Sequence, residues 1–184
     1  MEERGTTAML VLAARGGDVA AVRSLYVRFA RVVHGVLLGY VQHADAEDLT
    51  QDVFQTALQR LTELREPAAF PGWLLRIARN AALNRIRQSR VLETARPEID
   101  TKVMIDHNAS PDTRLEALHA LAAIQSLPEA YRETLMLRLV EGLSGPEISE
   151  RTGLTPGTVR VNLHRGMGLL RRALGIGVAR EVET

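Results

Sequence analysis

The sequence predicts an all-α fold, with two small helical domains joined by a flexible linker. Apolar residues recur at helical spacing along most of the 184 residues, and no segment shows the alternation of apolar and polar residues that is typical of a strand. A polar segment with two prolines interrupts this pattern at 91–112, and its length favours two domains over one. The composition is that of a globular chain, because 46% of the residues are hydrophobic and 24% are charged.

The N-terminal domain is expected at 1–90 and contains three predicted helices. The first follows Asp18, whose side chain can cap it, and reaches about residue 42. The second covers about 45–64 and the third about 68–90, after a break at Pro67. The inward stripe of the second helix is expected to consist of Leu49, Val53, Phe54, Ala57, Leu58 and Leu61.

The C-terminal domain is expected at 113–176, between the acidic linker 91–112 and a short tail at 177–184. Two helices are predicted there at about 113–126 and 128–141, and the second ends at a glycine.

The segment 144–163 predicts a helix-turn-helix. Ser144 and Glu147 have the spacing of a capping box at the start of a short helix, which should end before Gly153. Thr155 can then cap a final helix that runs to about residue 174. In a helix-turn-helix, the second helix enters the major groove of DNA. A generic pair of helices with a tight turn would show the same local pattern.

The final helix presents polar and basic residues opposite its buried side. If Val159 points inward, the opposite side can contact phosphates through arginine, base edges through histidine and threonine, and a thymine methyl group through Val161. The predicted contact residues are Thr158, Arg160, Val161, His164 and Arg165.

The third helix of the N-terminal domain has a basic face. Residues 71–90 contain five arginines and no acid. Asparagines lie between the arginines, and amide groups can donate to and accept from base edges while guanidinium groups neutralise phosphates. A solvated helix face is the alternative interpretation. The face consists of Arg76, Arg79, Asn80, Asn84, Arg87 and Arg90.

The second predicted helix is acidic at its start. Asp45, Glu47, Asp48 and Asp52 lie within 45–55, where there is no basic residue. Three of these carboxylates are spaced i, i+3 and i+7, so they project in a row and do not converge on one point. The pattern therefore favours a docking face for a basic protein partner over a metal site.

Other functional classes find no support in the sequence. The chain has no cysteine, which excludes a disulfide scaffold and a thiolate zinc site. It has no glycine-rich phosphate loop, and its five histidines fall on different predicted elements, so we expect no enzyme activity, metal, cofactor or small-molecule substrate. No apolar run approaches the ~18 residues of a membrane span, and no signal pattern begins the chain, so a cytoplasmic protein with no membrane partner is expected.

Taken together, these segments resemble a bacterial RNA polymerase sigma factor of the sigma-70 family, extracytoplasmic-function (ECF) group. The stretch DAEDLTQDVFQTAL resembles its region 2.2, and FPGWLLRIARNAALNRIR resembles regions 2.3 and 2.4. The stretch LPEAYRETLMLRLVEGLSGPEISERTGLTPGTVRVNLHRG resembles region 4. The resemblance covers about residues 18–174, with the motifs in the family's order.

The resemblance implies three partners: core RNA polymerase, through its β′ clamp helices and β flap; promoter DNA; and an anti-sigma factor. It implies base capture at the loop 65–70 and a −35 sequence that differs from the family's common one, because Val161-Asn162 stands where the family usually has Ser-Arg. Core docking is implied at Asp45, Asp48, Leu49, Gln51, Asp52 and Phe54. Recognition of the −10 element is implied at Arg76, Asn80, Asn84 and Arg87, and of the −35 element at Arg138, Arg160, Val161, His164 and Arg165.

Two other functions remain open from the residues themselves. A stand-alone helix-turn-helix regulator would bind DNA without polymerase, but it would have no need of the acidic face at 45–52. A helical protein-interaction module would use its basic faces for acidic protein partners, and competition by DNA would distinguish it.

Overall fold

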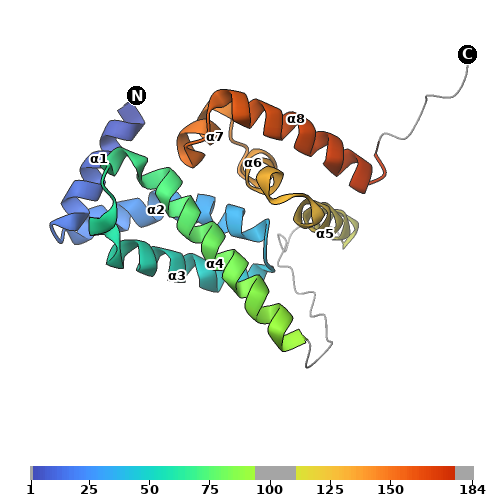
Figure 1. Ribbon diagram of the computed structural model, residues 1–184, viewed down its shortest axis with the longest axis horizontal. Coiled ribbons are helices and arrows are strands. Elements are labelled where there is room, and N and C mark those ends of the chain that lie inside the picture. Colours follow the sequence, from blue (N-terminus) through green and yellow to red (C-terminus); the bar gives the residue numbers. More distant parts are fainter. Residues whose placement is uncertain (1, 94–110, 177–184) are drawn as a thin grey trace, which may run out of the picture.

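The computed structural model describes residues 2–93 and 111–176. The middle of the predicted linker, 94–110, and the predicted tail lie outside the described residues. Within the described part all regular structure is helical, as expected. The N-terminal unit comprises α1 (Glu2–Arg15), α2 (Val19–Leu38), α3 (His43–Gln59), the short turns η1 (Leu61–Glu63) and η2 (Pro67–Ala69), and α4 (Phe70–Glu93). The C-terminal unit comprises α5 (Pro111–Ser126), α6 (Glu129–Leu139), α7 (Gly145–Thr152) and α8 (Pro156–Ala173) (Figure 1).

Helix α1 was not predicted. Its inner side buries Thr7 and Val11, four residues apart, against the rest of the N-terminal unit. The helix ends at a turn where Gly17 has a positive φ of 87°, a conformation that favours glycine. Arg15 then donates to the backbone carbonyls of Leu61 and Leu64, so α1 holds the connection between α3 and α4 in place.

The cap of α2 is confirmed, but the limits of the second predicted helix are not. Asp18 accepts hydrogen bonds from the backbone N–H groups of Ala20 and Ala21, at 2.8 and 3.2 Å. Helix α3 ends at Gln59, and the turn η1 follows. The inward prediction for Leu58 is wrong, since its side chain is 38% exposed; after the helix ends, the turn carries Leu61 into the core instead.

The local signals of the helix-turn-helix are confirmed. Ser144 and Glu147 form both hydrogen bonds of a capping box, with 2.7 Å between the Ser144 backbone N and the Glu147 Oε2. Helix α7 ends at Gly153 in the left-handed conformation, with φ 76°. Thr155 caps α8 by accepting from the backbone N–H of Thr158. These short-range interactions fix the angle at which α8 leaves the turn.

The two units share a buried core. The larger cluster joins residues of α2, α3 and α4 to Leu137, Ile148 and Val159 of the C-terminal unit. The contacts run from α2 to α6 and from α4 to α7, which lie side by side in Figure 1. A second cluster within the C-terminal unit is formed by Ile124, Leu127, Leu135, Met136 and Leu170. The units are therefore packed against each other in this structure, which the linker pattern alone did not predict.

Candidate nucleic-acid and protein interfaces

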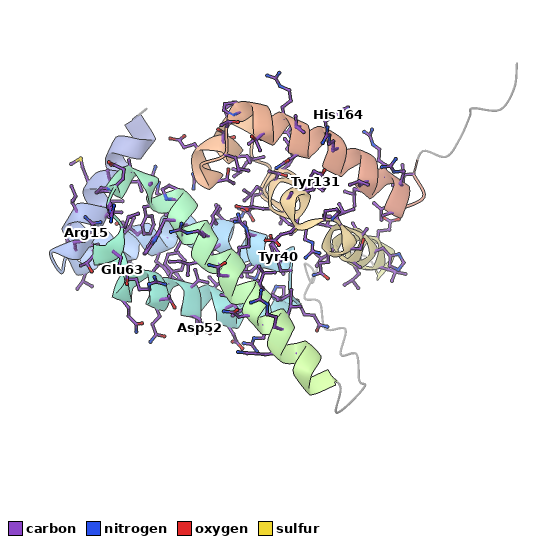
Figure 2. All side chains as sticks on the ribbon, viewed as in Figure 1. Arg15, Tyr40, Asp52, Glu63, Tyr131 and His164 are labelled. Carbon is purple, nitrogen blue, oxygen red and sulfur yellow. The ribbon has the colours of Figure 1, made fainter. Side chains whose placement is uncertain are left out.

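The acidic face of α3 is partly at the surface. Asp48, Gln51 and Asp52 are exposed, and Figure 2 shows Asp52 on the outer side of α3, away from the C-terminal unit. Asp45 is partly buried and pairs with Arg85 of α4, with 3.1 Å between the Asp45 Oδ1 and the Arg85 Nη1. The face therefore offers a partner a short row of polar side chains, with Asp45 tied to the fold.

The two apolar residues of this predicted docking set lie inside the protein. Leu49 is 6% exposed and Phe54 is 5% exposed. The Phe54 ring packs on the Tyr26 ring of α2, with 4.7 Å between their centroids. In this structure Phe54 holds α3 against α2 and Leu49 lies in the same buried core, so both support the acidic face without presenting an exposed surface.

The predicted −10 residues form a stripe along α4. Arg76, Asn80 and Asn84 are spaced four residues apart and Arg87 follows, so their side chains share one side of the helix, and all of them are exposed. The stripe leads to a pocket of about 710 Å³ at the start of α4. The loop before α4 lines this pocket with Arg65 and Glu66, α4 lines it with Gly72, Trp73 and Arg76, and the C-terminal unit contributes Glu150 and Gly153.

Arg79 departs from the prediction. The sequence placed it on the basic face with Arg76, but in the structure it points to α6 and pairs with Glu133 and, at 3.9 Å, with Glu129. Arg79 lies three residues from Arg76, at the edge of the basic face that Glu129 and Glu133 of the C-terminal unit reach. Arg79, one of the five arginines at 71–90, is therefore ion-paired with carboxylates of the same chain.

The outward side of α8 is free of the N-terminal unit. Thr158, Arg160, Val161, His164 and Arg165 are all exposed, whereas Val159 is buried as expected. Figure 2 shows His164 on the outer edge of α8, on the side away from α4. The sequence prediction of an inward and an outward side of this helix is confirmed.

Arg138 and Asn162 have roles that the spacing did not reveal. The Arg138 guanidinium is exposed, but its Nη1 donates to the backbone carbonyl of Leu143 at 3.0 Å, which ties the end of α6 to the turn before α7. Asn162 donates from its Nδ2 to the carbonyl of Ala130 at 3.0 Å and so anchors α8 to the start of α6. Both side chains hold the helix-turn-helix in its orientation.

Among the described residues, no group of three or more potential metal-ligating side chains is arranged to hold an ion. Within 2–93 and 111–176, no helix combines the length and the apolar character that crossing a bilayer requires.

The fold and its faces are those of an all-helical protein with a helix-turn-helix, a basic face on α4 and an acidic face on α3. Comparison with known proteins then gives the family. Sigma-70 region 2 matches residues 25–91, and Sigma-70, region 4 matches residues 119–170. The RNA polymerase sigma factor CarQ of Myxococcus xanthus is 35% identical over 164 residues, which cover 88% of this chain and 93% of CarQ. The ECF RNA polymerase sigma-E factor of Escherichia coli strain K12 is 31% identical over 176 residues, which cover 90% of this chain and 92% of that protein. The chain belongs to the sigma-70 family of RNA polymerase sigma factors, in its ECF group.

Solved structures show the same fold. CnrH, in its complex with the cytosolic domain of CnrY, matches with a TM-score of 0.63 and 23% identity, over 93% of this chain and 98% of that chain. The sigma factor RpoE of Bartonella quintana, in its complex with the anti-sigma factor NepR, matches with a TM-score of 0.61 and 19% identity, over 84% of this chain and 97% of that chain.

Proposed function

We propose that this protein binds core RNA polymerase and directs it to promoters by recognising −10 and −35 elements. The observation that carries the proposal is that three chemically distinct faces occur on three separate helices of one chain: acidic on α3, basic with asparagines on α4, and basic on α8. An acidic face suits a basic protein surface, and the two basic faces suit DNA. A stand-alone DNA-binding regulator would have no use for the acidic face of α3.

The proposed roles divide between the two domains: core binding and −10 recognition belong to residues 1–90, and −35 recognition belongs to residues 113–176. The polar residues Asp45, Asp48, Gln51 and Asp52 bind the β′ clamp helices of polymerase, and Leu49 and Phe54 support them. The stripe of α4 reads the −10 element, and the pocket at its start takes up an extruded base. The outward side of α8, through Thr158, Arg160, Val161, His164 and Arg165, reads the −35 element, with Arg138 holding the helix-turn-helix in position.

The protein itself carries out no chemical step, since a sigma factor supplies specificity to an enzyme that polymerises RNA. Its place of action is the cytoplasm, where polymerase and the chromosome are. Because the RpoE structure that shares this fold is a complex with an anti-sigma factor, we further propose that an anti-sigma factor binds this chain and holds it inactive.

The experiment that tests the proposal combines core binding with transcription. The wild-type chain should bind core polymerase in a titration and should start transcription from a cognate promoter selected from a random library. Asn80→Ala with Asn84→Ala should leave core binding unchanged and reduce promoter opening, because an amide that contacts a base edge contributes ~1–3 kcal/mol of discrimination. Normal transcription by this double variant would refute the −10 assignment, and absence of core binding by the wild type would refute the proposed function.

A further inference from the structure

We propose that the second half of α8 and the end of α6 form a binding site for one DNA strand beside the −35 element, with Gly168 as its floor and Arg171 and Arg138 holding a phosphate group. The proposal rests on the proposed function, because it extends the DNA contact of α8. It adds Gly168 and Arg171, neither of which is among the predicted contact residues. Three observations carry it: a glycine that packing does not require, a pocket without an acid, and the length of α8.

Gly168 lies inside α8 at a position where the packing of the protein does not require a glycine. Gly166, two residues earlier, lies against α6, where a Cβ atom would lie 3.1 Å from the Leu135 Cδ1 and 3.2 Å from the Tyr131 Cβ. At Gly168, by contrast, a Cβ atom would meet nothing within 4 Å outside the backbone of its own helix. Glycine inside a helix is less stable than alanine, and it serves where a ligand approaches the backbone closely. The bare side of α8 at Gly168 therefore indicates a partner that comes close to the helix.

Gly168 lines a surface pocket of about 510 Å³ where α6, α7 and α8 meet. The pocket brings together the side chains of Arg138, His164 and Arg171, and none of its described lining residues is acidic. The rest of the lining is apolar or glycine. The neighbouring pocket between α7 and α8 differs, because Glu150 lines it. Basic side chains beside apolar walls suit the phosphates and sugars of a nucleic-acid strand.

The basic side chains of the pocket have hydrogen-bond donors available. Arg171 and His164 are exposed, and neither takes part in an ion pair among the described residues. Arg138 is also exposed, and it donates from its Nη1 to the Leu143 carbonyl, which leaves the N–H groups of its Nε and Nη2 for a ligand. A guanidinium group binds phosphate through paired hydrogen bonds, so two arginines with free donors in one pocket can hold a phosphate of DNA.

The length of α8 places this pocket at the DNA backbone and not over the bases. In a helix-turn-helix, residues near the N-terminus of the second helix contact base edges. At 1.5 Å per residue, the predicted contacts from Thr158 to Arg165 span about 10 Å, which fits a major groove about 12 Å wide. Arg171 lies about 9 Å further along the helix. It follows His164 by nearly two complete turns, so the two side chains share one side, and that side continues past the edge of the groove to the phosphates.

The first test removes the charge of Arg171 and locates the phosphate that it binds. Arg171→Ala in holoenzyme should weaken promoter binding about tenfold, because a hydrogen bond to a charged group is lost, and should lower the slope of log K against log salt by about one. In a promoter series, single phosphates beside the −35 element are replaced by neutral methylphosphonates. One replacement should weaken binding by the wild type and leave binding by Arg171→Ala unaffected. Arg172→Ala is the matched control, because it removes the same charge from an exposed neighbour outside the pocket, and it should bind as the wild type does.

The second test fills the pocket. Gly168→Leu replaces a glycine by a residue that favours the helix, so its melting temperature should equal or exceed that of the wild type. Its side chain takes the place of the DNA strand, so promoter binding in holoenzyme should fall while core binding stays unchanged. A glycine with a merely structural role would not combine a loss of affinity with unimpaired stability. Gly5→Leu in α1 is the matched control, because a Cβ atom there also meets nothing within 4 Å, and it should leave promoter binding unchanged.

Three results would overturn the proposal. Unchanged promoter affinity in both Arg171→Ala and Gly168→Leu would show that DNA does not use this pocket. Equal losses in Arg171→Ala and Arg172→Ala, with no phosphate position that distinguishes them from the wild type, would show a general effect of charge. Weaker core binding by Gly168→Leu would assign the pocket to a contact with polymerase. Failure of the wild type to bind core polymerase would instead refute the proposed function, whereas failure of this inference leaves core binding by the wild type intact.

Discussion

Reversing the charge of the acidic face should weaken binding to core polymerase without unfolding the protein. Asp48→Arg with Asp52→Arg changes two exposed side chains on the outer side of α3. Asp45 is left intact, because it pairs with Arg85 of α4 at 3.1 Å and its reversal would mix the loss of that pair with the effect on binding. The melting temperature of the double variant should therefore stay close to that of the wild type.

The size of the effect follows from the exposure of the two carboxylates. An exposed ion pair is worth about 0.2–1 kcal/mol, and a like-charge contact of the same geometry opposes binding by a similar amount. Two reversals should then cost about 0.8–4 kcal/mol of binding free energy, or about 4- to 800-fold in Kd. The loss of core affinity relative to the wild type should be smaller at high salt, because salt screens charges that lie at the surface.

The assay is a titration of labelled core polymerase with each variant at two salt concentrations. Glu116→Arg, an exposed reversal on α5, is matched against the single variant Asp52→Arg and should leave core affinity unchanged. Equal affinity of the double variant and the wild type at low salt would refute the assignment of this face. An equal loss in Glu116→Arg and Asp52→Arg would show a general effect of net charge.

Three further predictions concern the helix-turn-helix. Arg165→Ala in holoenzyme should weaken promoter binding about equally for all sequences and reduce the slope of log K against log salt by about one, because one phosphate contact is lost. Val161→Ala should leave that slope unchanged and alter the preferred base in the −35 element, as selection from a random library would show, because an apolar contact reads a methyl group. Ser144→Ala should lower the free energy of unfolding by about 1 kcal/mol through loss of the N-cap. Hydrogen bonds from the Ser144 hydroxyl and backbone N–H also lower the pKa of Glu147, so the part of the stability that depends on the Glu147 carboxylate is present above the ordinary glutamate pKa and is lost as the pH falls through the lowered one. The backbone part of the cap does not titrate, so the difference between the thermal melts of variant and wild type should shrink in acid without vanishing.

Features that depend on short-range interactions could be predicted from the sequence. The cap at Asp18, the capping box of Ser144 and Glu147, and the cap at Thr155 all join residues two or three positions apart. Such interactions are set by side-chain type and local backbone geometry, with little dependence on the rest of the fold. The inward and outward sides of α8 follow from helical periodicity in the same way.

Features that depend on contacts between distant segments could not be predicted. Arg79 lies in an acid-free block, so the sequence suggested a DNA-facing side chain, whereas its partner Glu133 is 54 residues away. The inward prediction for Leu58 failed because α3 ends at Gln59 and the turn η1 that follows places Leu61 in the core. Helix α1 did have a signal, the spacing of Thr7 and Val11 ahead of the turn at Gly17, and that signal could have found it.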